Sequence, residues 1–345
     1  MPSAEFVLAG AILVSLTLYA LLGGADYGGG VWDLLARGPR AERQRDLIAS
    51  AIGPVWEANH VWLILVVVVL FTAFPPAFAA MATALHIPLT LVLIGIVLRG
   101  SAFTFRAYDR REDRVQRRWG RVFSIASLIT PVLLGVTLGA LAAGGISVQN
   151  GVVTTGFIRS WYAPFPFAVG LFALALFAFL AAVYLTLETD EADLQEDFRR
   201  RALAAGVAVG VLALAVFLLA EGGAPRIRRG LAESWWTWPL QIATAAAAGA
   251  LLALWRRWFR LARFCAAAQV SLIVWGWGAA QFPYLIEPDL TIHNAAAPPA
   301  TLKFLCWALA IGAALLLPSF YYLFRVFKGG HFNQSQPHSP SRGRH

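Results

Sequence analysis

Long uninterrupted apolar runs constrain the fold of this chain more than any other feature of its sequence. Runs such as residues 6–22, 122–141 and 165–187 contain no charged side chain. Crossing the roughly 30 Å hydrocarbon core of a bilayer takes about 20 helical residues at about 1.5 Å each. The runs also lack the alternation that is typical of strands in a membrane barrel. They therefore predict membrane-spanning α-helices.

The composition supports a membrane protein and excludes several other classes. The 345 residues are 59% apolar and only 14% charged, with a mean hydropathy of +0.64, which a soluble domain could not bury. The net charge of +9 comes from arginines between apolar runs, so we expect no nucleic-acid partner. Cys265 and Cys306 both lie inside apolar runs and read as small buried hydrophobes, and we expect no metal site.

The pattern predicts an all-α, polytopic membrane protein with about nine transmembrane helices in a bundle. One membrane domain is expected over residues 1–328, followed by a disordered cytoplasmic tail over residues 329–345, which is polar. Proline pairs and single prolines mark several of the expected helix ends. The expected spans are residues 6–24, 55–74, 77–99, 122–142, 164–187, 202–220, 237–255, 263–282 and 302–325.

The distribution of lysine and arginine predicts the orientation in the membrane. With the N-terminus placed outside, 23 of the 28 basic residues fall on the inner side of the nine expected spans. Because cytoplasmic loops carry the excess of lysine and arginine, we expect a periplasmic N-terminus and a cytoplasmic C-terminus. The charged segment 188–201 is then cytoplasmic, either as a helical extension or as a solvated hairpin.

Ionisable residues gather around the first expected loop, between Gly24 and Trp62. Asp26 is expected at the cytoplasmic end of the first helix, in a glycine-rich stretch, where burial and the helix dipole both disfavour the carboxylate. The alternative is a turn aspartate that caps the chain or pairs with an arginine of the loop. Charged groups at membrane depth are costly and usually face a bundle interior or an ion path.

A second group of polar residues follows in the segment WEANH. Glu57 is expected three residues into the second helix, where the helix N-terminus favours its ionised form. His60 lies three residues further on the same face, so two carboxylates and a histidine are plausible proton-relay elements. The alternative for Glu57 is an interfacial glutamate that satisfies free N–H groups. Trp56 and Asn59 add hydrogen-bonding groups.

Two further residues invite a functional interpretation. Arg99, at the end of the third expected span, either pairs with Asp26 or Glu57 or extends to the membrane surface. His86 is expected deep in that span, where Pro88 frees a backbone carbonyl. We expect a packed, hydrogen-bonded histidine there and not a haem ligand, because no second deep histidine stands out.

Seven motifs in order make the chain resemble subunit II of the cytochrome bd-type quinol oxidases from Phe6 to about Phe327. The form EANHVWLI is more narrowly similar to the cyanide-insensitive branch, a ubiquinol oxidase. The motifs are GADYGGGVWDL, GPVWEANHVWLI, FPPAFA, LHIPL, LRGSAFTFR, YLTLET and QFPYLIEPDLTI.

The resemblance implies a heterodimeric terminal oxidase of the bacterial cytoplasmic (inner) membrane that oxidises quinol and reduces dioxygen to water. Haems b and d and their axial ligands belong to the partner, subunit I, so this chain is expected to have no haem ligand and no catalytic residue of its own. A structural quinone or lipid and a small accessory subunit are further expected binding partners.

The resemblance also implies roles for individual residues. Asp26 and Glu57 match acids implicated in a cytoplasmic path that delivers protons to the oxygen-reducing haem, with Trp56, Asn59, His60 and Arg99 as supporting residues. Some members carry Asp at the position of Glu57, and members vary at His60 and His86. The alternative function is a stand-alone proton-coupled transporter, although no inverted repeat is evident.

Overall fold

The computed structural model describes residues 3–108, 113–232 and 237–329. Within these ranges, only the backbone is described for residues 53–58, 103, 106–108, 113–117, 231–232, 237, 239–240 and 323–329. The expected tail therefore lies outside the described residues from residue 330 onward.

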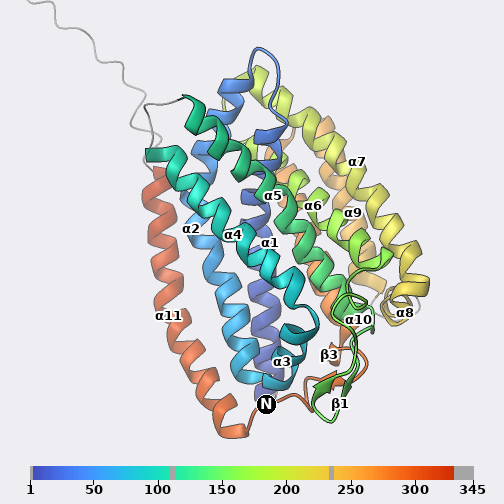
Figure 1. Ribbon diagram of the computed structural model, residues 1–345. Helices are drawn as coiled ribbons and strands as arrows, with labels where there is room; N and C mark the ends of the chain where they lie inside the picture. The colour runs from blue at the N-terminus through green and yellow to red at the C-terminus, as the bar shows by residue number, and fades with distance from the viewer. Residues whose placement is uncertain (1–2, 109–112, 233–236, 330–345) are drawn as a thin grey trace, which may run out of the picture.

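The described part of the chain is all-α except for two short hairpins, as the sequence predicts (Figure 1). The hairpins are antiparallel and consist of β1 (Val148–Gln149) with β2 (Val152–Val153), and β3 (Tyr284–Ile286) with β4 (Leu290–Thr291). The helices are α1 (Ala4–Leu34), α2 (Ala41–Ala73), α3 (Pro75–Ala84), α4 (His86–Tyr108), α5 (Asp113–Ala142), α6 (Pro164–Leu185), α7 (Ala192–Gly223), α8 (Pro225–Ala232), α9 (Thr237–Trp255), α10 (Phe259–Gln281) and α11 (Pro299–Gly329).

Among the described residues, six helices are long and apolar enough to cross a membrane, and seven if the bent pair α2–α3 counts as one span. The six belong to α1, α5, α6, α7, α10 and α11. The apolar stretches His86–Ala102 and Gln241–Trp255 are shorter. All nine segments predicted from the sequence coincide with helix, but the third segment is divided at Leu85 between α3 and α4.

Prolines explain both breaks in this region. The last turns of α2 and the helix α3 differ in direction by 117°, and Pro75 and Pro76 begin α3, as proline does readily at a first helical turn. Pro88 has no amide hydrogen for the carbonyl of Ala84, which is where α3 ends. A single straight third span over residues 77–99 was therefore a wrong prediction.

The first two helices are longer than predicted, because the glycine-rich stretch is helical. α1 continues to Leu34 and α2 already begins at Ala41. A Cβ atom on Gly28 would lie 2.0 Å from the carbonyl oxygen of Phe177 in α6. These glycines thus permit close helix crossings instead of forming a turn.

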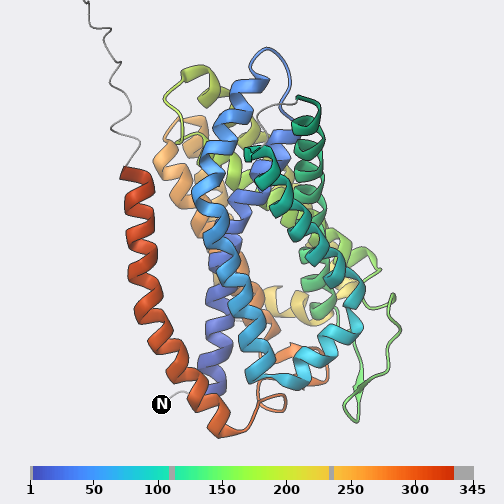
Figure 2. The ribbon, with the colours of Figure 1, turned by 60° about the vertical axis from the view of Figure 1, so that its left-hand side comes forward.

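Helix α1 lies at the centre of the bundle and contacts α2, α5, α6, α10 and α11. The turn between α1 and α2 and the start of α7 lie at one end, and we call this the α1–α2 end (Figure 1). The N-terminus, α3, α8 and both hairpins lie at the opposite end, while α11 flanks the bundle beside α2 (Figures 1 and 2). The predicted orientation would place the α1–α2 end in the cytoplasm.

A polar network attaches the α1–α2 turn to the first turns of α7. Arg40 donates from Nε and Nη2 to the two carboxylate oxygens of Asp197, at 2.8 and 2.7 Å. Gln44 also donates to Asp197 at 2.8 Å and accepts from Arg201 at 2.7 Å. Because α7 begins at Ala192, the charged segment that ends at residue 201 is largely a helical extension and not a hairpin.

Candidate functional site

A buried ion pair between Asp26 of α1 and Arg99 of α4 forms the centre of the site. Their side chains are 0% and 1% exposed. Arg99 donates from Nη1 to Oδ2 of Asp26 at 2.6 Å, and its Nη2 donates to Oδ1 and, at 3.0 Å, to the backbone carbonyl of Asp26. The planar guanidinium thus meets the carboxylate with both of its terminal nitrogens, the geometry of a strong charge-assisted pair.

The surroundings of Arg99 complete its coordination. Its Nε donates to the Ser127 hydroxyl of α5 at 2.8 Å. Its guanidinium carbon lies 4.4 Å from the ring centroid of Tyr27 and 4.8 Å from that of Phe123. Aromatic faces and a hydroxyl therefore replace water around a charge that lies in the bundle interior.

Asn59 and His60 of α2 extend the cluster from the carboxylate. The amide nitrogen of Asn59, which is 0% exposed, donates to Oδ2 of Asp26 at 2.7 Å. The amide oxygen of Asn59 faces Nδ1 of the half-buried His60. Helices α1, α2, α4 and α5 thus contribute to one continuous polar cluster.

The carboxylate of Asp26 accepts hydrogen bonds from two other helices. Its two carboxylate oxygens receive N–H groups only, from Arg99 and Asn59. Removing one partner of a buried ion pair costs about 3–5 kcal/mol, because the other charge remains unpaired. Each partner of the pair therefore depends on the other to remain in the bundle interior.

The outcomes for the predicted site residues differ. The structure brings together Asp26, Asn59, His60 and Arg99, and it selects pairing over surface extension for Arg99. Glu57 and Trp56 lie in α2, in the same turns as Asn59, but their side chains are outside the described residues.

The helix-end arguments for the two acids were wrong. Asp26 lies eight residues before the end of α1, and Glu57 lies sixteen residues after the start of α2. Helix termini act on charges within about one turn, so opposed helix dipoles do not distinguish these two carboxylates. The arginine partner of Asp26 comes from α4 and not from the neighbouring loop.

Several residues around the cluster were not predicted from the sequence, among them Ser127 and Phe123 beside Arg99. Tyr19 and Tyr27 are buried on α1, with their hydroxyl oxygens 3.1 Å apart. Asp33, seven residues after Asp26, is 5% exposed and accepts a hydrogen bond from Ser124 at 2.9 Å. The spacing of seven in GADYGGGVWDLL, two helical turns, could have indicated that both aspartates lie on one face.

His86 differs from its predicted setting. It is exposed at the first turn of α4, and its Nδ1 lies 3.0 Å from the carbonyl oxygen of Thr83. Its ring meets Phe157 edge-on at 4.9 Å between centroids. The hydrogen bond of this histidine is confirmed, but its packed position nine residues into one continuous helix was wrong, because the helix breaks at Leu85 and His86 is the first, exposed residue of α4. Within the described ranges no group of three or more His, Cys, Asp or Glu side chains could hold a metal.

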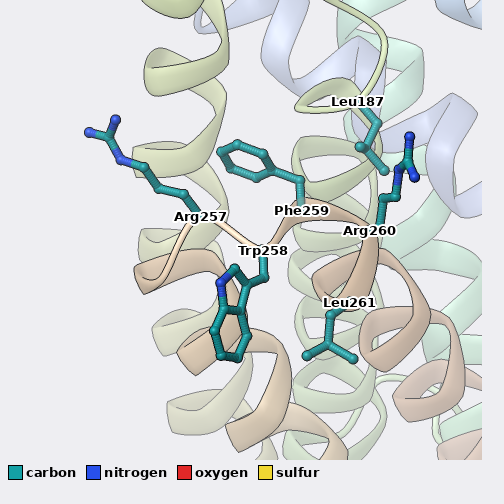
Figure 3. Close-up of a pocket in the computed structure, with 6 residues that line it drawn as sticks. All are labelled: Leu187, Arg257, Trp258, Phe259, Arg260 and Leu261. Carbon is teal, nitrogen blue, oxygen red and sulfur yellow. The ribbon is translucent and has the colours of Figure 1, made fainter.

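A surface depression of about 470 Å³ lies away from this cluster, at the α1–α2 end, where α9 is followed by α10 (Figure 3). Arg257 and Arg260 point in different directions around Phe259, while Trp258 and Leu261 point away from Leu187 (Figure 3). The residues do not converge on a common point, so the depression has no catalytic arrangement.

Comparisons with known proteins identify the family. The sequence profile described as cytochrome bd terminal oxidase subunit II matches residues 4–327. The chain belongs to this family. It is therefore a multi-pass membrane subunit of a bacterial respiratory quinol oxidase, an oxidoreductase complex in which it has subunit I as its partner.

Individual relatives agree with the family match. A putative cytochrome bd menaquinol oxidase subunit II of Bacillus subtilis (strain 168) is 24% identical over 321 residues, which cover 90% of this chain and 91% of the relative. Subunit 2 of the cytochrome bd-I ubiquinol oxidase of Escherichia coli (strain K12) is 27% identical over 187 residues, 53% of this chain and 48% of that protein.

A solved structure shares the fold. A chain of the bd oxidase from Geobacillus thermodenitrificans superposes with a TM-score of 0.80, covering 96% of this chain and 99% of that chain at 22% identity. The relatives are named for menaquinol or for ubiquinol. The predicted ubiquinol-using, cyanide-insensitive branch therefore stays a prediction.

Proposed function

We propose that this subunit supports the haem-bearing subunit I and provides a path for protons from the cytoplasm to the site of dioxygen reduction. The observation that carries the proposal is the polar cluster in the bundle interior, because ionisable groups at membrane depth usually serve an ion path. Reduction of one dioxygen to two waters consumes four protons. Taking them up from the cytoplasm would make the complex electrogenic.

The acids of this path have different roles. Asp26 and Arg99 form a buried ion pair whose opposite charges compensate each other, which makes a polar environment tolerable among apolar helices. Glu57, in the same helical turns as Asn59, is the proposed carrier, because a carboxylic acid can take up and release a proton and ionisable groups at membrane depth usually serve an ion path. Asn59 and His60 support the path by joining the ion pair to α2.

The cofactors of the reaction belong to the partner in this proposal. Haems b and d supply electron transfer and dioxygen chemistry when bound to subunit I. The described contacts of the two histidines are with protein groups, since His60 faces Asn59 and His86 faces Thr83. Quinol is the substrate of the whole complex, and a structural quinone or lipid and a small accessory subunit complete the set of proposed partners.

Glu57→Gln tests the path in the purified complex. We expect a lower kcat for quinol oxidation and slower proton uptake in liposomes, with unchanged haem spectra, because the amide cannot carry a proton. Asp46→Asn is the control, since Asp46 is an exposed acid of the same helix. Full turnover and full proton uptake in Glu57→Gln would leave the subunit with a supporting role only.

A second assay separates the oxidase from a stand-alone transporter. Affinity purification of this chain should recover a larger subunit with haem absorbance. Recovery of the chain alone, with solute transport in liposomes, would contradict the proposal.

A further inference from the structure

A polar surface depression of about 330 Å³ lies at the α1–α2 end, between the turn after α1 and the first turns of α7 (Figure 1). The charged side chains that line it are four arginines and one carboxylate, that of Asp197. The arginines come from both elements and are Arg37, Arg40, Arg200 and Arg201. The lining of the depression therefore has a clear excess of positive charge.

The carboxylates near the depression are already engaged by arginines. Asp197 accepts two hydrogen bonds from Arg40, one on each oxygen. Glu196 accepts from Arg200 at 3.0 Å. The same carboxylate is also contacted by two further arginines, Arg199 and Arg257. The positive charge of this region thus exceeds what its own acids compensate.

Arg201 is the arginine of the depression with the least compensation. Its Nη2 donates to the neutral amide oxygen of Gln44 at 2.7 Å, and its buried Nη1 donates to no group among the described residues. Its guanidinium carbon lies 5.5 Å from the ring centroid of Trp32 and 5.1 Å from that of Phe198. Because guanidinium groups pair with phosphate through several N–H groups at once, Arg201 retains capacity to bind an anion.

The depression lies at the level where the apolar part of α7 begins. Arg201 is the last charged residue before the uncharged run 202–220. On the other side, the exposed residues Leu34 and Leu35 directly precede the turn that contains Arg37. Lipid phosphate groups lie at such a boundary between apolar and polar surface, and basic pockets between membrane helices bind anionic headgroups.

An apolar strip on α7 continues from the depression along the outside of the helix. It consists of four side chains that are 56–62% exposed, Val207, Val211, Leu214 and Leu218. They follow Arg200 at the spacing of a single helix face. The strip is about 16 Å long at about 1.5 Å per residue, which is about half of the roughly 30 Å hydrocarbon core and matches one lipid leaflet.

We propose that the depression binds the phosphate group of an anionic phospholipid, with an acyl chain along the apolar strip of α7. Arg37, Arg200 and Arg201 supply the positive charge, while Arg40 stays paired with Asp197. The charge excess selects an anion, and the adjoining strip selects a lipid over free phosphate. The site makes the lipid among the proposed partners specific and does not depend on the proton path.

The test uses the complete purified oxidase in detergent micelles, titrated with dioleoylphosphatidylglycerol and followed by native mass spectrometry. We expect the complex to bind this lipid more tightly than dioleoylphosphatidylcholine, whose headgroup has no net charge. The double variant Arg37→Gln/Arg200→Gln should bind phosphatidylglycerol about tenfold or more weakly, because each arginine near an anionic lipid contributes several-fold to binding. Both side chains are exposed, so the fold should be retained.

The matched control is Arg159→Gln/Lys303→Gln, which removes two exposed positive charges at the opposite end of the bundle. It should bind phosphatidylglycerol as the unmodified complex does.

Unchanged affinity for phosphatidylglycerol in the arginine variant would overturn the inference. If that variant does not assemble, the unmodified complex decides, since equal binding of the two lipids also overturns it. Displacement of phosphatidylglycerol by millimolar inorganic phosphate would assign the depression to a soluble anion instead of a lipid. The readout is lipid binding, so its failure leaves the proton path untouched, whereas failure of that path appears in the turnover of Glu57→Gln.

Discussion

The ion pair between Asp26 and Arg99 gives the sharpest quantitative prediction. In Asp26→Asn the guanidinium of Arg99, 1% exposed, loses its counter-charge but stays in the bundle interior. In Arg99→Gln the carboxylate is left unpaired in the same way. Each single variant should lower the free energy of unfolding by about 3–5 kcal/mol, the cost of an uncompensated buried charge.

The double variant removes both charges and should cost no more than either single variant. The resulting coupling free energy should then be at least as large as one single cost, about 3–5 kcal/mol. The two groups are in direct contact through two charged hydrogen bonds, whereas independent effects are expected only for residues more than about 7–10 Å apart. Thermal and detergent-induced unfolding of the purified complex measure this double-mutant cycle. If the cost of the double variant equals the sum of the two single costs, the reasoning is refuted, because the two charges would then not compensate each other.

Three further perturbations test other parts of the fold. Gly30→Ala should destabilise by about 1–3 kcal/mol, since its methyl group would overlap a serine on α5, whereas Gly10→Ala on the same helix has open space and should not. Asp197→Asn should cost about 1–3 kcal/mol, because it removes the negative charge and one of the two oxygens that accept from Arg40, while Asp193→Asn, whose side chain is 73% exposed, should be nearly neutral. Burial raises the pKa of Glu287 above its usual 4.5, so its contribution to stability is present at low pH and is lost as the pH rises through that raised value. Glutamine does not titrate, so Glu287→Gln removes this dependence on pH. The melting temperature of the variant complex should therefore fall less than that of the unmodified complex as the pH rises through the raised pKa of Glu287.

Local features of the sequence were enough to predict the class of fold and the region of the site. Apolar runs predicted helices that the structure confirms, and the rarity of charges at membrane depth singled out Asp26 and Arg99. The helix boundaries were less predictable, because glycines usually indicate turns. In this chain the glycines from Gly23 to Gly30 permit close packing inside α1, which carries the helix ten residues beyond its expected end.

The relations among the polar residues depended on contacts that are distant in the sequence. Asp26 and Arg99 are 73 positions apart, and the sequence left open whether the arginine pairs or extends to the surface. Asp33 was overlooked because a single aspartate near a helix end resembles an ordinary solvated residue.

The sequence alone determined that this chain is a helical membrane protein, because the length and apolarity of each run are local properties, and its motifs made it resemble the bd oxidase subunit II family. Only the tertiary structure decided which carboxylate faces a guanidinium and which faces a hydroxyl. That decision depends on which helices pack together, because the described partners of both aspartates come from other helices.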